Sequence, residues 1–329
     1  MDCSLPVADV RSAAVDLHQP WQLRVVIPVM AALCLLPALL AWIDEPFYLV
    51  LASRVMIYTL AATSLNLLVG FGGMVSFGHA AYFGAGAYVV GIASAHGLQS
   101  AWLAWPLACA VAALAALAIG AISLRTRGVY FIMITLAFAQ MMYYVFVSLK
   151  NYGGEDGLPL DARSGVGFGL NLKSDLTFYY VTLAVVAAAI GVLWRVVNSR
   201  FGRALQGVRE NESRMEASGY PVFRIRLAAF VIAGAAAGLA GALAANQNDM
   251  ASPAFLNWTQ SGMLLIMVIL GGLGRFLGPA LGALVLLVLE EVISGHTLHW
   301  QFYVGAVLVA VVLFAPDGLA TLVRGNRRD

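Results

Sequence analysis

Long apolar runs alternate with short polar segments along most of this chain. The runs predict ten helical spans, at residues 23–43, 47–70, 79–96, 101–124, 128–149, 177–197, 226–245, 261–273, 277–294 and 301–315. Most of them approach the roughly 20 residues that an α-helix needs to cross a bilayer. The runs at 261–273 and 301–315 are short, which favours broken or tilted helices buried within protein. The pattern predicts an all-α polytopic membrane protein with about ten transmembrane helices.

Composition supports this interpretation and argues against a soluble enzyme. Of the 329 residues, 61% are hydrophobic and 11% are charged, whereas soluble domains carry roughly 25% charged residues. The first 22 residues contain three aspartates and no apolar core, so they do not resemble a signal peptide. The three cysteines show no metal-binding or disulfide spacing, and we expect no metal and no cofactor. The predicted organisation is a tail (1–22), a membrane domain (23–315) and a second tail (316–329).

The distribution of arginine predicts the orientation of the spans. Arginines precede the first span, separate spans four and five, crowd the connection 198–226, separate spans eight and nine, and close the chain. With ten spans, all these segments fall on one side, and most acidic residues of the connections fall on the other. The positive-inside rule then places both termini and the 198–226 connection in the cytoplasm.

Two connections are too long to be simple turns. Residues 150–176 are rich in glycine and acidic residues and are predicted to face outside. Residues 198–226 are dense in charge and face inside. Apolar residues recur between the charges of this second connection, which predicts one or two short surface helices that end near Gly219 and Pro221.

The stretch "GFGGMVSFGHAAYFGAGAYVVG" at 70–91 contains seven glycines. A phosphate-binding loop would need a lysine directly after a glycine, and leucine precedes both lysines of the chain. We therefore predict that the chain is not an enzyme that hydrolyses ATP. The glycines instead favour a break between two spans over 70–78, followed by a face of small residues along which a neighbouring helix can pack closely. A second face of small residues begins at Gly234.

Polar residues near this break are candidates for a translocation pathway. On the second span, Thr59, Thr63, Asn66 and Gly70 share a helical face. Such a face either lines a pathway for a polar substrate or forms hydrogen bonds with a neighbouring helix. His79 is either a proton relay or a packed polar residue. The candidate pathway residues are Thr63, Asn66, Gly70, Gly73, Ser76 and His79.

Three charged residues fall within the outer half of the predicted membrane region. Arg54 lies in the second span, and Glu290 and Glu291 lie near the outer end of the ninth. Unpaired charges at membrane depth are unfavourable. Either Arg54 pairs with one of the glutamates, or each side chain extends separately to the outer surface.

Three segments resemble blocks of a known family, in the family order. They are "SLNLLVGFGGMVSFGHAAYFGAGAYV" (64–89), "ALQGVRENESRMEASGYPVFRIRLAAFVIAGAAAGLAGAL" (204–243) and "GGLGRFLGPALGA" (271–283). Together they are similar to the permeases for branched-chain amino acids in ATP-binding-cassette importers. The length, the N-terminal extension and "GGEDGLP" (153–159) resemble the LivM-type subunit of that family.

The resemblance implies an importer permease fold in the bacterial inner membrane. It also implies three kinds of partner: a second, LivH-type permease subunit, two cytoplasmic ATPase subunits and a periplasmic substrate-binding protein. No nucleic acid is expected to bind. The connection 198–226 would be the loop that couples the permease to the ATPases. Its candidate coupling residues are Arg203, Arg209, Glu210, Glu212, Glu216 and Gly219.

Two other functions stay open at this point. A urea or short-amide permease of the same family would have the same architecture, because the binding protein usually selects the solute. An ion-coupled secondary transporter would need buried acidic residues near the membrane midplane. The predicted spans contain only Glu290 and Glu291, both near one end, which argues against that alternative.

Overall fold

The computed structural model describes residues 28–37, 46–160, 162–165, 172, 174–297, 299, 302–306, 308–309 and 318–319. The predicted N-terminal tail, most of the C-terminal tail, and parts of the first and last predicted spans lie outside the described residues. The count of ten spans therefore stays a prediction.

Helices form nearly the whole of the described chain. Their bounds are α2 (Pro46–Asn66), η1 (Leu67–Phe71, a π-helix), α3 (His79–Ala95), α4 (Ala101–Ser123), α5 (Val129–Ser148), η2 (Lys150–Tyr152), α6 (Asp175–Val197), α7 (Arg200–Glu210), α8 (Glu212–Ala217), α9 (Val222–Asn248), η3 (Pro253–Leu256), α10 (Trp258–Gly271) and α11 (Gly278–Ser294). Two short strands, β1 (Leu158–Pro159) and β2 (Met250–Ala251), pair antiparallel.

Eight of the ten predicted spans coincide with described helices to within a few residues. Among the described residues, five helices are long and apolar enough to cross a membrane: Phe47–Phe71, α4, α5, α6 and α9. Shorter apolar helices occupy Pro28–Pro37 and α10. The prediction of an all-α polytopic membrane fold is confirmed.

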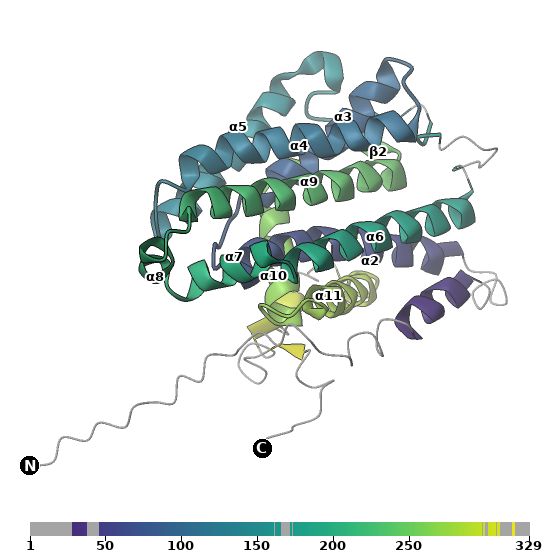
Figure 1. The fold of residues 1–329 in the computed structure, drawn as a ribbon. Coiled ribbons are helices and arrows are strands. Elements are labelled where there is room, and N and C mark those ends of the chain that lie inside the picture. The colour runs from purple at the N-terminus through teal and green to yellow at the C-terminus, as the bar shows by residue number, and fades with distance from the viewer. Residues whose placement is uncertain are drawn as a thin grey trace, which may run out of the picture.

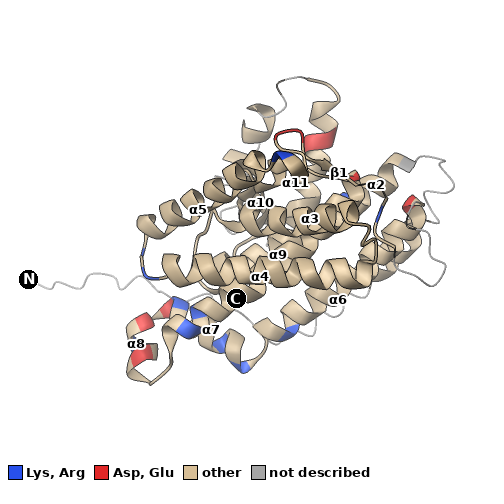
Figure 2. Ribbon diagram, turned by 90° about the horizontal axis from the view of Figure 1, so that it is seen from above, with Lys and Arg blue, Asp and Glu red and all other residues tan. Residues whose placement is uncertain are grey.

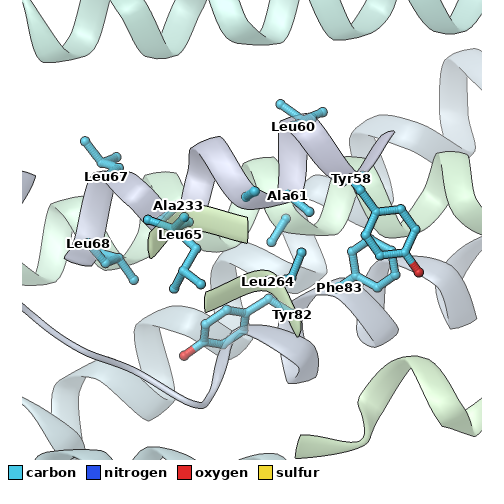
Figure 3. Close-up of a cluster of buried hydrophobic side chains, with 14 of the residues drawn as sticks. Tyr58, Leu60, Ala61, Leu65, Leu67, Leu68, Tyr82, Phe83, Ala233 and Leu264 are labelled. Carbon is cyan, nitrogen blue, oxygen red and sulfur yellow. The ribbon is translucent and has the colours of Figure 1, made fainter. Parts of the chain in front are cut away.

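Helix α9 lies at the centre of the bundle (Figure 1). It packs most extensively against α4 and α3, and also against α2, which in turn contacts α6, α10 and α11. Apolar side chains from α2, α3, α9 and α10 meet in the core (Figure 3), among them Leu60, Leu65, Tyr82, Ala233 and Leu264. By contrast, α4 and α5 each keep a broad apolar face that the chain itself does not cover.

Small residues allow α9 to approach its neighbours closely, as the second predicted small face requires. Gly234 and Gly238 lie against Ala116 and Ala112 of α4, and a Cβ added to Gly241 would overlap the backbone carbonyl of Phe83 on α3. Such small interfaces are typical of helices that pack within a bilayer.

The face of small residues predicted on α3 packs against several elements. Gly84 and Gly91 lie against Leu256 of η3 and Ala251 of β2, which are not parts of a long helix. Ala87 of the same face lies close to Gly241 of α9. The neighbouring Gly86 also meets α9, because a Cβ there would overlap the backbone of Gly238. The sequence shows that a helical face consists of small residues, but it does not show which segment packs against that face.

The crossing that contains α3 is interrupted. Helix α3 begins at His79, whose Nε2 lies 2.7 Å from Oγ of Ser64. Ser64 precedes the end of η1 at Phe71 by seven residues, which is about 10 Å of helix. Residues 72–78 therefore run back beside α2 as non-helical chain before α3 starts. Non-helical backbone at membrane depth requires burial within protein.

A second interrupted crossing contains α10. After α9 ends, the chain returns through β2 and η3, and Leu256 of η3 reaches Gly84 in α3. Helix α10 then starts at Trp258 and continues to Gly271. The backbone N–H of Ala80 donates a hydrogen bond to Oγ of Ser261 at 2.8 Å, so the beginnings of α3 and α10 meet inside the bundle.

The predicted bounds of the two long connections need correction. Helix α9 begins at Val222 because its buried positions Val222, Ile225 and Ala229 already follow helical spacing, so the connection between α6 and α9 is 198–221. The other connection ends where α6 starts, at Asp175. It is anchored by the pairing of β1 with β2 and by Arg163, which contacts Asp175 and Asp249 at 2.8 and 3.2 Å.

Charge separates the two ends of the bundle. Figure 2 shows α4 and α5 without charged residues, whereas charges gather on α7, α8 and the turn that joins α4 to α5. We call this part, together with the α10–α11 loop that carries Arg275, the arginine-rich end. The contacts of Arg163 lie at the opposite end. Two segments that the sequence places on the same side of the membrane contact each other at the arginine-rich end, because Arg127 of the α4–α5 turn lies 3.3 Å from Glu212 of α8.

We predict that Gly241→Ala destabilises the folded chain by about 1–3 kcal/mol, because the added methyl group meets backbone that cannot rotate away. The matched control is Gly191→Ala on α6, where an added Cβ has no atom within 4 Å. The control should be neutral or slightly stabilising, because alanine favours helix more than glycine does. Thermal unfolding in detergent measures both. Equal midpoints for the two variants would contradict the described packing of α9 on α3.

Candidate functional site

The start of α3 is held by hydroxyl side chains from several elements. Backbone N–H groups of Phe77, Gly78 and Ala80 donate to the hydroxyl oxygens of Thr135, Ser76 and Ser261. These distances are 3.2, 3.1 and 2.8 Å. The first N–H groups of a helix have no partners within the helix, and in a bilayer no water replaces them. We call the meeting point of α3 and α10 the helix junction.

His79, the first residue of α3, is completely buried. The hydroxyl of Ser64 donates to the carbonyl of Ala61 at 2.7 Å and lies 2.7 Å from Nε2 of His79. A hydroxyl has one hydrogen, so this geometry requires Nε2–H of His79 to donate to Ser64. Nδ1 is then a buried acceptor, and it has no hydrogen-bond partner among the described residues.

Asn66 connects the end of α2 to the α10–α11 loop. Its side-chain amide donates to the carbonyl of Arg275 at 2.9 Å, and its side-chain carbonyl accepts from the N–H of Gly274 at 3.2 Å. Of the two roles open to this polar face, hydrogen bonding to a neighbouring segment is the one that Asn66 performs here. Thr63 on the same face is also buried.

The candidate pathway residues surround this junction and are mostly enclosed. Thr63, Asn66, Gly70, Ser76 and His79 are all buried. Gly73 is exposed at the arginine-rich end, where it lies against the side chain of Arg209. Five of the six residues are therefore closed off by packing in this conformation.

The six candidate coupling residues divide into two groups. Arg209 and Glu212 contact other parts of their own chain. The guanidinium group of Arg209 donates to the carbonyl of Gly70, whereas Glu212 forms two hydrogen bonds with Arg226 of α9, at 2.9 and 3.1 Å. Glu212 also lies 3.3 Å from Arg127 of the α4–α5 turn.

The other four coupling residues, Arg203, Glu210, Glu216 and Gly219, are exposed, and so is Arg209 despite its contact with Gly70. Gly219 ends α8 with a positive φ of 82°. Its N–H donates to the carbonyl of Glu216, and the N–H of Tyr220 donates to that of Met215, which is the hydrogen-bond pattern of a Schellman motif. The aromatic rings of Tyr220 and Phe223 are exposed beside it.

Several residues that complete the site were not singled out from the sequence. They are Ser64, Thr135, Ser261 and Gly274 around the helix junction, and Arg127 and Arg226 around Glu212. The three hydroxyl residues carried a weak signal, because each lies within an apolar run, and the two arginines entered only the prediction of orientation. Their partners come from distant segments, which spacing along the chain does not reveal.

The structure brings the three charges of the outer half together. Arg54 lies 3.3 Å from Glu290 and 3.8 Å from Glu291, and its guanidinium group is 5.8 Å from the ring centroid of Tyr58. The hydroxyl of Tyr58 accepts a hydrogen bond from Gln260 at 2.9 Å. Glu290 is the more enclosed of the two glutamates. Mutual contact lowers the cost of keeping these charges within a membrane.

We predict that Arg54→Ala and Glu290→Ala are not additive. Once one partner is lost, removing the other should cost about 1 kcal/mol less than it does in the parent chain, because the contact is already broken. Thermal unfolding of the two single variants and the double variant measures this difference. The cycle with Glu291→Ala should give a smaller coupling, because that contact is longer and more exposed. Additive effects in both cycles would contradict the ion pair.

A helical bundle with five membrane-length apolar helices among the described residues, two interrupted crossings and a charged loop at one end is the architecture of a polytopic membrane protein. A family model described as "Branched-chain amino acid transport system / permease component" matches residues 47–316. This match covers most of the chain, and the chain belongs to that family.

Individual relatives agree with this placement. The "High-affinity branched-chain amino acid transport system permease protein LivM" of Escherichia coli is 28% identical over 297 residues, which cover 83% of this chain and 70% of the relative. The protein of the same name from Salmonella typhimurium matches equally well. The "Ribose import permease protein RbsC" of Haemophilus influenzae is 24% identical over 177 residues, covering 51% of this chain and 53% of that protein. No solved structure matches this chain significantly.

Proposed function

We propose that this chain is the permease subunit of an ATP-driven importer and moves branched-chain amino acids into the cell by alternating access. The observation that supports this proposal most strongly is a contact between the interior of the bundle and its charged end. Two interrupted helices meet inside the bundle, and the charged α7–α8 region at one end contacts the chain that leads to them. Family membership and the similarity to LivM support the solute class.

The helix junction is the proposed centre of the pathway. Transport sites commonly lie where helices break near the membrane midplane, with helix N-termini pointing at the site. The N-termini of α3 and α10 meet in this way, and their non-helical segments lie in opposite halves of the bundle. Thr63, Asn66, Gly70, Gly73, Ser76 and His79 would line the route after these segments separate. In the present conformation the route is closed.

The proposed partners follow from the two exposed surfaces. The exposed residues of the α7–α8 region carry charge of both signs beside Tyr220 and Phe223, which suits docking on a cytoplasmic ATPase. The uncovered apolar faces of α4 and α5 suit lipid or a second, LivH-type permease subunit. Two ATPase subunits and a periplasmic substrate-binding protein would complete the importer.

The proposed location is the bacterial inner membrane, with the arginine-rich end and both termini in the cytoplasm. The excess of arginine over acidic residues at that end supports this orientation. ATP hydrolysis is assigned to the partner subunits, because the sequence has no lysine in the setting of a phosphate-binding loop.

The urea or short-amide permease is the main alternative, and the similarity to a ribose permease indicates that related proteins serve different solutes. An ion-coupled transporter is less well supported. Such a transporter would use acidic residues near the membrane midplane, whereas Glu290 and Glu291 of α11 lie near one end of the bundle and pair with Arg54.

We predict that uptake by this chain requires its ATPase partners. The chain should be purified with the permease, ATPase and binding-protein subunits encoded beside it, and reconstituted in liposomes. Leucine, isoleucine or valine should stimulate ATP hydrolysis and accumulate in the liposomes, whereas urea and ribose serve as solute controls. Uptake that persists without ATPases would contradict an ATP-driven importer. Stimulation by urea or ribose alone would contradict the solute class.

A further inference from the structure

We propose that Arg209 is the positioning residue that transmits movement of α7 to the interrupted helices, rather than a residue that docks on the ATPase. This inference rests on the proposed function. It assigns Arg209 an intramolecular role, because its guanidinium group reaches back to the membrane domain and donates to the carbonyl of Gly70.

Helix α7 is positioned to carry such a movement. Its buried residues Gly202, Leu205 and Val208 face the bundle, whereas Arg203 and Glu210 are exposed. Leu205 is completely buried, and its side chain lies close to Gly72. Arg209 occupies the last turn of α7 on the side from which it reaches η1. The helix therefore presents one surface to a partner and the other to the chain break.

The carbonyl of Gly70 belongs to the last turn of the π-helix η1. In that turn the N–H groups of Gly72 and Met74 donate to the carbonyls of Leu67 and Leu68, at 3.1 and 2.9 Å. The carbonyl of Gly70 accepts from Arg209 instead. A cation at a helix C-terminus is favourable, because the carbonyl ends there carry partial negative charge. π-helical turns are rare and frequently occur at functional sites.

Glycines make room for Arg209. Gly73 has a φ of 67°, and a Cβ at this position would lie 2.9 Å from Cγ of Arg209. Gly274 has a φ of 74°, and its Cβ would lie 3.4 Å from the Nη1 atom of Arg209. A Cβ on Gly70 would overlap the side chain of Asn66. Two glycines from distant segments, Gly73 and Gly274, thus lie against the side chain of Arg209, although the residue as a whole is exposed.

These contacts join three segments into one unit. Arg209 links α7 to the end of η1, and Asn66 links the end of α2 to the α10–α11 loop through Gly274 and Arg275. The segment formed by the end of α2 and η1 precedes the non-helical chain before α3, and the α10–α11 loop follows α10. A shift of α7 would therefore move the arginine-rich ends of both interrupted crossings together.

A docking role for Arg209 predicts a different defect. If Arg209 bound the ATPase, its loss would weaken assembly and lower hydrolysis. If Arg209 links α7 to η1, its loss leaves assembly and hydrolysis intact. It then uncouples ATP hydrolysis from movement of the helices that line the pathway. The number of ATP molecules hydrolysed per solute transported distinguishes these two roles.

The test uses the complete reconstituted complex with Arg209→Gln, and Arg195→Gln as the control. Arg195 is an exposed arginine in the last turn of α6 at the same end of the bundle. We expect Arg209→Gln to raise ATP consumption per solute by about threefold or more, with normal assembly. Arg209→Lys should give an intermediate value, because it retains the charge but not the forked donor. Arg195→Gln should match the parent complex.

A distance measurement supplies a second readout. Spin labels at the exposed positions Glu210 and Leu273 report on α7 and the α10–α11 loop, in a complex with its native cysteines replaced. ATP binding should leave their separation unchanged in the parent chain and change it in Arg209→Gln. If Arg209→Gln does not assemble, Gly73→Ala replaces it, because the added methyl group would push against the stem of Arg209.

The outcomes separate this inference from the proposed function. A parent complex that shows no solute-stimulated hydrolysis and no uptake contradicts the proposed function. An active parent complex, with an unchanged ATP-to-solute ratio in Arg209→Gln or in its replacement Gly73→Ala, overturns only the role of Arg209. Loss of ATPase binding in Arg209→Gln, with Gly73→Ala coupled normally, would assign Arg209 to docking and also overturn it.

Discussion

The structure depends on one constraint, which is that every buried backbone polar group needs a partner inside the protein. Unbroken helices meet this requirement by themselves. The two interrupted crossings do not, and several of their free N–H and carbonyl groups are bound by side chains. Ser76, Thr135 and Ser261 serve the start of α3, and Arg209 serves the end of η1. Hydrogen bonds from side chains therefore stabilise the interruptions. A movement of the helices would have to break these bonds and form others in their place.

Close packing around α9 complements these polar contacts. Small residues bring α3 and α4 against α9 so tightly that little adjustment is available there. Helix α3 of one interrupted crossing belongs to this tightly packed part, whereas the end of η1 is linked to α7 through Arg209 at the arginine-rich end. Under the proposed function, we expect movement mainly in the segments around Gly70–Gly78 and the α10–α11 loop. In the importer that we propose, the ATPase would act on the charged surface beside α7.

Much of this fold could be predicted from the sequence, because helix length and apolar composition are local properties. Eight predicted spans match described helices, and Gly219 ends α8 near the predicted position. The contacts were harder to predict. Gly84 packs against η3, and Arg209 binds its own chain, because each partner lies far away in the sequence. The small residues indicated where close packing occurs, but only the three-dimensional arrangement identifies what fills the space.

The central claim is that the arginine-rich end faces the cytoplasm, where α7 can meet an ATPase. The most direct measurement is sided labelling of Ser213→Cys, an exposed position in α8, in a chain whose three native cysteines are replaced. A membrane-impermeant maleimide should label this cysteine in inverted inner-membrane vesicles and leave it unmodified in intact spheroplasts. Labelling in spheroplasts, with none in inverted vesicles, would contradict the account.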